Sequence, residues 1–504
     1  MALPVLSKTQ ILNQLDSGYH WTGSTITYSV PTSVSSMTGS YEKTSFTALS
    51  AQQTSAFQLA ISLWSDVIAK PVVNAGTGRA NITVGNFNDS TGSDYAHTYF
   101  PTWGSVWFNT FFNGVNYGKT NDLVHPTVGL HGFATYIHEL GHGFGLDHAG
   151  NYNAGNGTPA PGSYQDSTVY SIMSYFGPSM GDGTDSRTHV KYSQEVAWGS
   201  WGGYDAQTPM LNDVMTMQNM YGVSTTTRTG NTTYGYHSNV TGGAASIYNF
   251  DTNTHPVMCI FDSSGIDTLD LSGDAHNDQI NLNSGAFSNV MGLTNNLSIA
   301  YSCTIENATG GSGNDTITGN AEANKLLGGA GNDIISGGAG ADNMDGGSGI
   351  NTLDYSSSAA GVNINLATLK ASGGDATGDT FLNFQNVTGS LTGADTLVGN
   401  GAANTLSGGN GNDFLQGGGG DDKLTGGAGA DMFQFLTGDG GRDEITDFKI
   451  GTDHVQLSKS FAASFAALHF TMSGDSAVLT MGNETIVFDH IAMNQLHASD
   501  FIFV

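Results

Sequence analysis

Basic side chains are scarce in this chain of 504 residues, where 14 lysines and arginines stand against 43 aspartates and glutamates, a formal net charge of −29. Such an excess of negative charge disfavours nucleic acid and anionic membrane surfaces as partners. The imbalance is uneven, because residues 1–227 hold 7 basic and 14 acidic side chains whereas residues 228–504 hold 7 and 29. The second half would repel itself on folding unless counter-ions bind, so its composition predicts bound calcium or magnesium.

Cysteine and long apolar runs are also nearly absent. Cys259 and Cys303 are the only cysteines, which excludes a disulfide framework; they either pair with each other or are small buried thiols. No stretch approaches 18 consecutive apolar residues, so we expect no membrane span or membrane insertion. The start, MALPVLSKTQILNQL, lacks a basic leader before a long apolar core, so we expect no N-terminal secretion signal.

What the chain does contain is typical of a globular protein with many tight turns, since 38 % of its residues are hydrophobic and 71 are glycine. Its length predicts two or three domains. In the first half we expect strands at 25–30 and 80–87, with one helix between them. Two more helices are expected at 131–145 and 211–221, which gives an α+β arrangement. The first helix has an apolar stripe with spacings of three and four, made by Phe57, Ala60, Ile61, Trp64 and Ile68.

Residues 138–148 read HELGHGFGLDH, a pattern that predicts a catalytic zinc site. His138 and His142 are four residues apart, so both imidazoles project from one face of a helix toward one ion. Gly145 lets the helix end and the chain turn, which returns His148 as a third ligand. Three neutral imidazoles with one open position are typical of catalytic zinc. Glu139 lies beside the first ligand and is predicted to be the general base.

From residue 310 the sequence repeats every nine residues, from GGSGNDTIT at 310–318 to Asp354, and the repeat returns at 390–434. Glycine-rich turns at the ends of short strands predict a β-roll in which the apolar eighth residue points inward. These core residues are Ile317, Ile335, Leu353, Leu397, Leu415 and Leu424.

The sixth position of most repeats is an aspartate, which we expect to face outward in register between successive turns. Carboxylates and turn carbonyls at this spacing form an oxygen cage that suits calcium. Positions 324, 351 and 404 are asparagine, so sites there should be weaker or absent. A purely structural glycine repeat is the alternative. The predicted calcium ligands are Asp315, Asp333, Asp342, Asp395, Asp413, Asp422 and Asp431.

With SIMSY at 171–175, the chain resembles the serralysin family of metzincin proteases, and TRTG at 227–230, DTLDLSG at 267–273 and TIENATGGSGNDTITGN at 304–320 extend the resemblance. The family implies that Met173 is a hydrophobic floor below the three histidines. It also implies that Tyr175 is a hinged zinc ligand that assists the transition state.

The resemblance further implies an α+β metzincin catalytic domain followed by an all-β parallel β-roll domain. The boundaries would be a short propeptide at 1–17, the catalytic domain at 18–227, and the calcium-binding roll with a C-terminal secretion region at 228–504. Two junction calcium sites are implied, although Asn231 and Ser264 depart from residues common in the family. The first would use Arg228, Gly230, Thr232, Asp262 and Asp267, and the second Gly265, Asp267, Thr304 and Glu306.

The function that follows is a secreted, extracellular endopeptidase of broad specificity, holding one catalytic zinc ion and several structural calcium ions. Zinc would activate water, Glu139 would remove its proton, and Tyr175 would donate to the oxyanion. The family implies a monomer that acts on protein substrates, export by bacterial type I secretion machinery that reads an ending such as DFIFV, and a small protein inhibitor as a further partner.

Two other functions are compatible with the repeats. A calcium-dependent adhesion protein with a vestigial zinc module is disfavoured by the intact Glu139 and histidines. A pore-forming toxin would need an apolar or amphipathic membrane-inserting region upstream, and none is visible.

Overall fold

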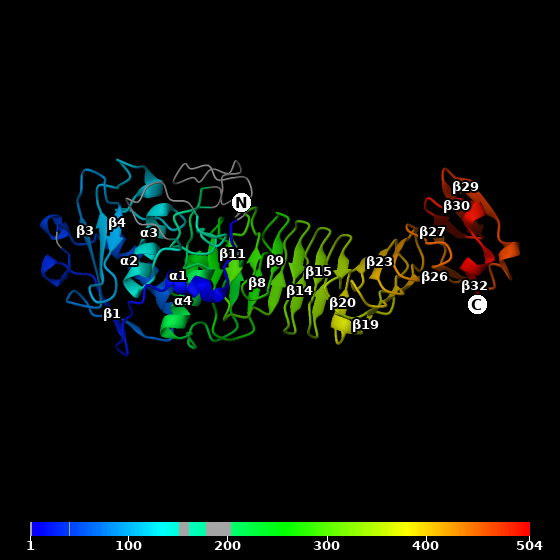
Figure 1. Ribbon diagram of the computed structural model, residues 1–504, viewed down its shortest axis with the longest axis horizontal. Coiled ribbons are helices and arrows are strands. Elements are labelled where there is room, and N and C mark those ends of the chain that lie inside the picture. Colours follow the sequence, from blue (N-terminus) through cyan, green and yellow to red (C-terminus); the bar gives the residue numbers. More distant parts are fainter. Residues whose placement is uncertain (1–2, 40, 151–160, 178–202) are drawn as a thin grey trace. The chain divides into compact units, whose positions relative to one another are not determined.

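The computed structural model describes residues 3–39, 41–150, 161–177 and 203–504. They form two compact units, one of residues 1–270 and 284–305 and the other of residues 271–283 and 306–504. The sequence placed a functional boundary at 227/228, whereas the compact units divide after residue 270. Figure 1 shows the helices concentrated in the first unit and short stacked strands in the second.

A five-stranded sheet in the order β2-β1-β3-β5-β4 organises the N-terminal part of the first unit. Its strands run parallel except β4, which pairs antiparallel with β5 and forms one edge. The strands are β1 (Ile26–Ser29), β2 (Val72–Asn74), β3 (Ile82–Phe87), β4 (Ala96–Thr98) and β5 (Ser105–Asn109). The other elements of this unit are α1 (Lys8–Leu15), α2 (Ala51–Val67), α3 (His131–Phe144), α4 (Leu211–Tyr221), β6 (Thr233–Gly235), α5 (Ala245–Tyr248), β7 (Met258–Ile260), β8 (Thr268–Asp270), β10 (Phe287–Ser288) and β11 (Leu297–Ile299).

Helices α2 and α3 are fixed by buried apolar contacts. The stripe predicted from the sequence is buried, with Phe57, Ala60 and Trp64 fully enclosed. The Trp64 indole N–H donates to the Ile137 carbonyl at 3.0 Å, which ties α2 to α3. Tyr136 on α3 stacks on Phe108 of β5 with ring centroids 3.9 Å apart. These contacts hold α3 in place against the sheet.

Most of the second unit is a parallel roll in which two nine-residue repeats make one turn, and antiparallel pairs occur only at residues 363–372 and 470–488 among the described strands of this unit. Thr316 pairs with Ile334, and Lys325 with Asn343, each 18 residues apart, so alternate repeats belong to different sheets. One stack is β12 (Asn307–Thr309), β14 (Lys325–Leu327), β16 (Asn343–Asp345) and β20 (Thr380–Leu382). A second stack is β9 (Gln279–Asn281), β13 (Thr316–Thr318), β15 (Ile334–Ser336), β17 (Thr352–Asp354), β21 (Asn386–Thr388), β23 (Thr405–Asn410), β25 (Lys423–Ala428), β27 (Gly441–Ile445), β31 (Glu484–Phe488), β30 (Ser476–Met481) and β29 (Phe470–Ser473). The third is β19 (Lys370–Ser372), β18 (Asn363–Asn365), β22 (Thr396–Val398), β24 (Phe414–Gln416), β26 (Met432–Phe435), β28 (His454–Leu457) and β32 (Phe501–Phe503).

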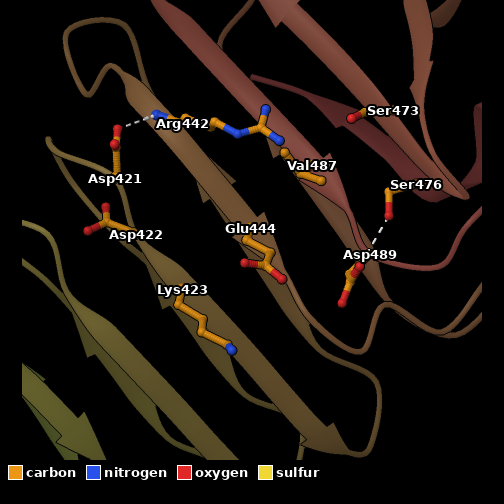
Figure 2. Close-up of a pocket in the computed structure, with 9 residues that line it drawn as sticks. All are labelled: Asp421, Asp422, Lys423, Arg442, Glu444, Ser473, Ser476, Val487 and Asp489. Atoms are coloured by element: carbon orange, nitrogen blue, oxygen red, sulfur yellow. Dashed lines mark hydrogen bonds between the residues drawn. The ribbon is translucent and has the colours of Figure 1, made fainter.

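The apolar eighth residues form the core of the roll, as the sequence predicted. All six residues named for this role have no exposed surface. The opposite face of the same strands is mostly polar, and Figure 2 shows Lys423 and Glu444 on neighbouring strands at a hollow with charges of both signs, together with the buried Val487. The next residue of each strand points into the core, because Leu424, Ile445 and Phe488 are paired with one another in register and are buried.

The expected direction of the sixth-position aspartates was wrong, because these side chains are buried between turns rather than facing outward. The Asp315 N–H donates to Asp333 Oδ1 at 2.8 Å, and the Asp413 N–H donates to Asp431 Oδ1 at 2.9 Å. Each carboxylate therefore bonds to the backbone one full turn earlier. The aspartates serve as rungs that hold the turns in register.

Cys259 and Cys303 are buried free thiols, so the alternative of a disulfide between them was wrong. Cys303 Sγ accepts a hydrogen bond from the Asp262 N–H at 3.2 Å. No helix in the described ranges has the length and apolar character needed to cross a membrane.

Candidate metal centre

Three histidines meet at the C-terminal end of α3. His138 and His142 lie one turn apart on the helix, which ends at Phe144. Gly145 follows with φ +114°, and its N–H donates to the carbonyls of Gly141 and His142. This left-handed turn brings His148 back, and the ligand atoms of the three histidines all lie within 4.8 Å of one another. The structure thus brings together the three residues predicted as zinc ligands.

Backbone carbonyls orient two of the imidazole rings. His138 Nδ1 donates to the Ile172 carbonyl at 2.8 Å, and His142 Nδ1 donates to the Leu146 carbonyl at 2.7 Å. Each ring therefore presents Nε2 toward the cluster. His142 Nε2 and His148 Nε2 are 3.2 Å apart, close to the separation of roughly 3.3 Å that two nitrogens have around tetrahedral zinc. The donor set and its orientation fit a zinc ion.

Burial also favours the neutral form that a metal requires. Desolvation, followed by the charge of the neighbouring His148, lowers the pKa of His142 to about 3. A neutral imidazole offers its lone pair without first losing a proton. At neutral pH this ring is ready to bind a cation.

Glu139 points to the edge of the sheet from the same helix. Its side chain is buried, and the Thr98 hydroxyl on β4 donates to its Oε2 at 2.8 Å. Desolvation raises the pKa of Glu139 to about 7, while the hydrogen bond from Thr98 opposes that shift. A carboxylate with a pKa near neutrality is suited to accept a proton and return it.

Met173 and Tyr175 lie on the turn that faces the histidines. Met173 is fully buried, and a Cβ on Gly141 would stand 2.6 Å from its sulfur, so only glycine permits this approach. The Tyr175 ring lies 4.6 Å from the His148 ring and 6.1 Å from the His138 ring. Burial, followed by the charge of Glu139, raises the pKa of Tyr175 to about 12, which keeps its hydroxyl protonated.

Asp213 on α4 supports this turn and was not found from the sequence. Its Oδ2 accepts the N–H groups of Ile172 and Met210 at 2.7 and 2.8 Å, and its Oδ1 accepts the Ser171 hydroxyl at 2.5 Å. Ile172 in turn accepts the hydrogen bond of His138. Asp213 therefore positions the backbone that orients a ligand ring. Nothing local in NDVM signals this role, because Ser171 and Ile172 lie about 40 residues away.

The first predicted junction calcium site lies within the first unit. Asp267 Oδ1 accepts the Thr232 N–H at 2.7 Å, and the Thr232 hydroxyl donates to the Gly230 carbonyl at 3.1 Å. A Cβ on Gly265 would stand 2.5 Å from that carbonyl oxygen, so these groups converge. Arg228 has φ +48°, and its guanidinium binds Asp66. Desolvation raises the pKa of Asp262, whose Oδ2 accepts the Tyr234 hydroxyl.

The second predicted set takes Gly265, Asp267 and Thr304 from the first unit and Glu306 from the second. The Glu306 carbonyl accepts the Asn324 side-chain amide at 2.7 Å. The family departures are ordinary turn residues in this chain. Asn231 Oδ1 accepts the Ile266 N–H, and the Ser264 N–H donates to Asp262.

The buried sixth-position aspartates form a ladder along the roll, and these ladder aspartates place carboxylate oxygens at the turns. Desolvation raises the pKa of Asp333 and Asp413 to about 6 and that of Asp342 and Asp422 to about 7. A buried carboxylate oxygen without a donor is costly unless a cation approaches it. Hydrogen-bond partners are lacking, within the described residues, for Oδ2 of Asp333, Asp342, Asp413, Asp422 and Asp431.

Sequence reasoning missed three aspartates that continue the ladder. The Asp342 N–H donates to Asp379 Oδ1, the Asp422 N–H to Asp443 Oδ1, and the Asp431 N–H to Asp453 Oδ1. Each occupies the sixth position of a degenerate repeat with an apolar eighth residue: GDATGDTFL, GDGGRDEIT and FKIGTDHVQ. The signal was present, but the glycine pattern is altered, because GDATGDTFL and GDGGRDEIT have aspartate at the second position and FKIGTDHVQ keeps only the glycine at the fourth.

The fold and the sites together define a chain with a three-histidine metal centre on an α+β unit and a parallel β-roll rich in buried carboxylates. Comparison with known families agrees, because the family model described as "Peptidase M10 serralysin C terminal" matches residues 223–503. The chain belongs to this family and is of the serralysin type.

Several curated proteins are similar to this chain. Metallopeptidase AprA of Pseudomonas marginalis is 36 % identical over 297 residues, which cover 58 % of this chain and 59 % of that protein. Serralysin of Photorhabdus sp. (strain Az29) is 37 % identical over 54 % of this chain and 53 % of its own length. Serralysin C of Dickeya chrysanthemi is 38 % identical over 54 % of each chain. The chain thus spans little more than half the length of the curated relatives it matches.

Proposed function

We propose that the chain is a secreted zinc-dependent endopeptidase of broad specificity, with its catalytic domain at 18–227, a calcium-binding roll at 228–504 and a short propeptide at 1–17. The observation that carries this proposal is the cluster of three imidazoles beside a buried carboxyl group, His138, His142, His148 and Glu139. The named relatives, metallopeptidases and serralysins, support it.

The substrate would bind as an extended strand along β4. This strand pairs with β5 on one side and is at the edge of the sheet, so its other side can accept a peptide backbone. Thr98 of β4 contacts Glu139, which places the added strand next to the general base. A peptide that is bound mainly through its backbone is selected only weakly by its side chains, which supports broad specificity.

The zinc ion, Glu139 and Tyr175 would each have a separate role in peptide hydrolysis. When bound to the three imidazoles, zinc would lower the pKa of a water molecule and polarise the scissile carbonyl. Glu139 would take the proton of the attacking water on a side-chain oxygen and then deliver it to the leaving amine. Tyr175, protonated at neutral pH and adjacent to His148, would donate to the oxyanion.

Calcium would bind at the junction sites and along the ladder, because the 7 basic side chains of residues 228–504 are too few to balance the 29 acidic ones. Low calcium inside a cell would leave the roll unfolded for passage through type I secretion machinery, and higher calcium outside would fold it. From the resemblance to the serralysin family we also infer protein substrates, a small protein inhibitor as a partner and a monomeric state.

Zinc ligation is tested by counting metal in histidine variants of the full chain. We expect His138→Ala, His142→Ala and His148→Ala each to lose bound zinc, measured by atomic emission after gel filtration. His131→Ala is the matched control, because His131 begins the same helix yet is outside the cluster. Full zinc content in the three ligand variants, or its loss in His131→Ala, would overturn the assignment.

A further inference from the structure

The second unit begins with a turn that precedes the repeats visible in the sequence. Residues 273–281 read GDAHNDQIN, which puts Asp278 at the sixth position and Ile280 at the eighth. Strand β9 pairs in parallel with β13, with Ile280 opposite Ile317, and Ile280 is buried. This segment is therefore a degenerate repeat stacked on the repeat at 310–318.

The two turns are joined by the same kind of bonds as the repeats. The Asp278 N–H donates to Asp315 Oδ1 at 2.8 Å, as the Asp315 N–H does to Asp333. The Ser312 N–H donates to the Asp274 carbonyl at 2.8 Å. The turn at 273–278 thus adds one step to the aspartate ladder.

Asp274 gives this turn a carboxylate that the regular repeats lack, because their second residue is usually glycine. Its Oδ1 accepts the N–H groups of Ala275 and His276 and the ring Nδ1–H of His276, at 2.7, 3.2 and 2.7 Å. Its Oδ2 is buried and has no hydrogen-bond partner among the described residues, while the whole residue is 5 % exposed. Five ladder aspartates have an Oδ2 in this same condition.

Among the residues that the structure describes, no hydrogen-bond donor reaches the buried oxygen to balance the charge at this step. His276 pairs with Oδ1, on the side of the carboxylate away from the unpartnered atom, and its ring is 59 % exposed. Burial raises the pKa of Asp315 and the charge of Asp274 adds to this, so the two carboxylates are within electrostatic reach of each other. Asp278 adds a third carboxylate at 1 % exposure.

We propose that the turns at 273–278 and 310–315 hold a further calcium ion, bound by Asp274 Oδ2, the carboxylates of Asp278 and Asp315, and turn carbonyl oxygens. An all-oxygen set with several carboxylates in a flexible turn suits calcium, which takes six to eight such ligands. This site lies beyond those expected from the repeats and rests on the proposal that the roll binds calcium. It would close the end of the ladder where the roll begins.

The test counts calcium ions per full-length chain at a fixed free calcium concentration. Asp274→Asn preserves the Oδ1 acceptor that holds the turn and replaces Oδ2 with an amide, so we expect one fewer ion per chain. His276→Gln removes the imidazole partner but no proposed ligand, and the count should stay at the wild-type value. The double variant Asp274→Asn/Asp278→Asn should also lose one ion, because both residues serve the same site.

An unchanged count in Asp274→Asn, or an equal loss in His276→Gln, would overturn the proposal, since either result makes Asp274 a purely structural turn residue. If Asp274→Asn alters the circular dichroism of the calcium-saturated chain, Asp278→Asn alone decides, because its ladder bond uses the backbone N–H. A wild-type chain without any bound calcium would overturn this site together with the ladder. Zinc content and casein hydrolysis are measured separately, so failure of the peptidase proposal is distinguishable.

Discussion

At the scale of single residues, the metal centre depends on backbone carbonyls and side chains that orient the histidines and Glu139 through hydrogen bonds. The Ile172 and Leu146 carbonyls orient His138 and His142, Thr98 positions Glu139, and Asp213 fixes the turn that carries Ile172. The three histidines and Glu139 could be predicted from the sequence because the motif lies within eleven residues. Thr98 and Asp213 could not, because the contacts that define their roles arise only when distant segments fold together.

Replacing Tyr175 by phenylalanine tests the proposed oxyanion donor. We expect kcat to fall about 100-fold or more, with little change in KM and unchanged zinc content, because one hydrogen bond to the developing charge is lost. Tyr170→Phe is the control, since Tyr170 lies on the same turn but its ring packs against Phe287. Steady-state kinetics on a peptide substrate measure the effect, and equal losses in the two variants would contradict the assigned role.

The titration of Asp213 should make the free energy of unfolding depend on pH. Burial raises its pKa to about 7, although three hydrogen bonds oppose the shift. The folded state thus holds a proton that the unfolded state releases near pH 4, so the free energy of unfolding decreases as pH rises from about 4 to 7. The full difference is on the order of 4 kcal/mol. In Asp213→Asn this contribution is absent.

The comparison is made by urea unfolding of wild type and Asp213→Asn at pH 5 and pH 8 in saturating calcium. Tryptophan fluorescence is the probe, because all six tryptophans precede residue 202. We expect Asp213→Asn to gain stability relative to wild type on going from pH 5 to pH 8. A difference between the two proteins that does not change with pH would show that Asp213 titrates normally.

At the scale of elements, the periodicity of the sequence predicted where helices and strands lie better than it predicted which strands pair. The expected helices at 131–145 and 211–221 match α3 and α4, and the strand at 80–87 contains β3. The nine-residue repeat predicted the buried eighth position correctly. The 18-residue turn and the inward aspartates were not predicted, because the repeat alone does not say which copies pair. Degenerate repeats such as the one at Asp443 were missed because their glycine pattern differs from that of the regular repeats.

The inner face of the roll predicts unequal costs for two leucines. Leu415 has no exposed surface, whereas Leu391 is 57 % exposed in a turn of the same roll. Leu415→Ala should lower the free energy of unfolding by about 2 to 5 kcal/mol, the usual cost of a cavity, and Leu391→Ala by less than about 0.5 kcal/mol. Urea unfolding of the calcium-saturated chains, followed by far-UV circular dichroism, measures both. Similar costs would contradict the alternation of faces.

At the scale of the whole molecule, negative charge makes folding depend on cations. The second half holds 29 acidic and 7 basic side chains, and many of the acidic ones are buried in the roll. We expect removal of calcium with a chelator at pH 7.5 to abolish the far-UV signal of the roll and to increase the hydrodynamic radius, with both restored by calcium. Asp333→Asn/Asp413→Asn should need more calcium for the same recovery. A roll that stays compact in chelator would contradict calcium-dependent folding.

Casein hydrolysis by wild type and Glu139→Ala, with zinc content determined on the same samples, tests most directly whether Glu139 is the base of a zinc peptidase. Both proteins should bind zinc through the three histidines, and only the wild type should cleave casein. If both bind zinc and neither cleaves, the centre is vestigial and a calcium-dependent binding role becomes the better account. If Glu139→Ala cleaves as well as wild type, Glu139 is not the base.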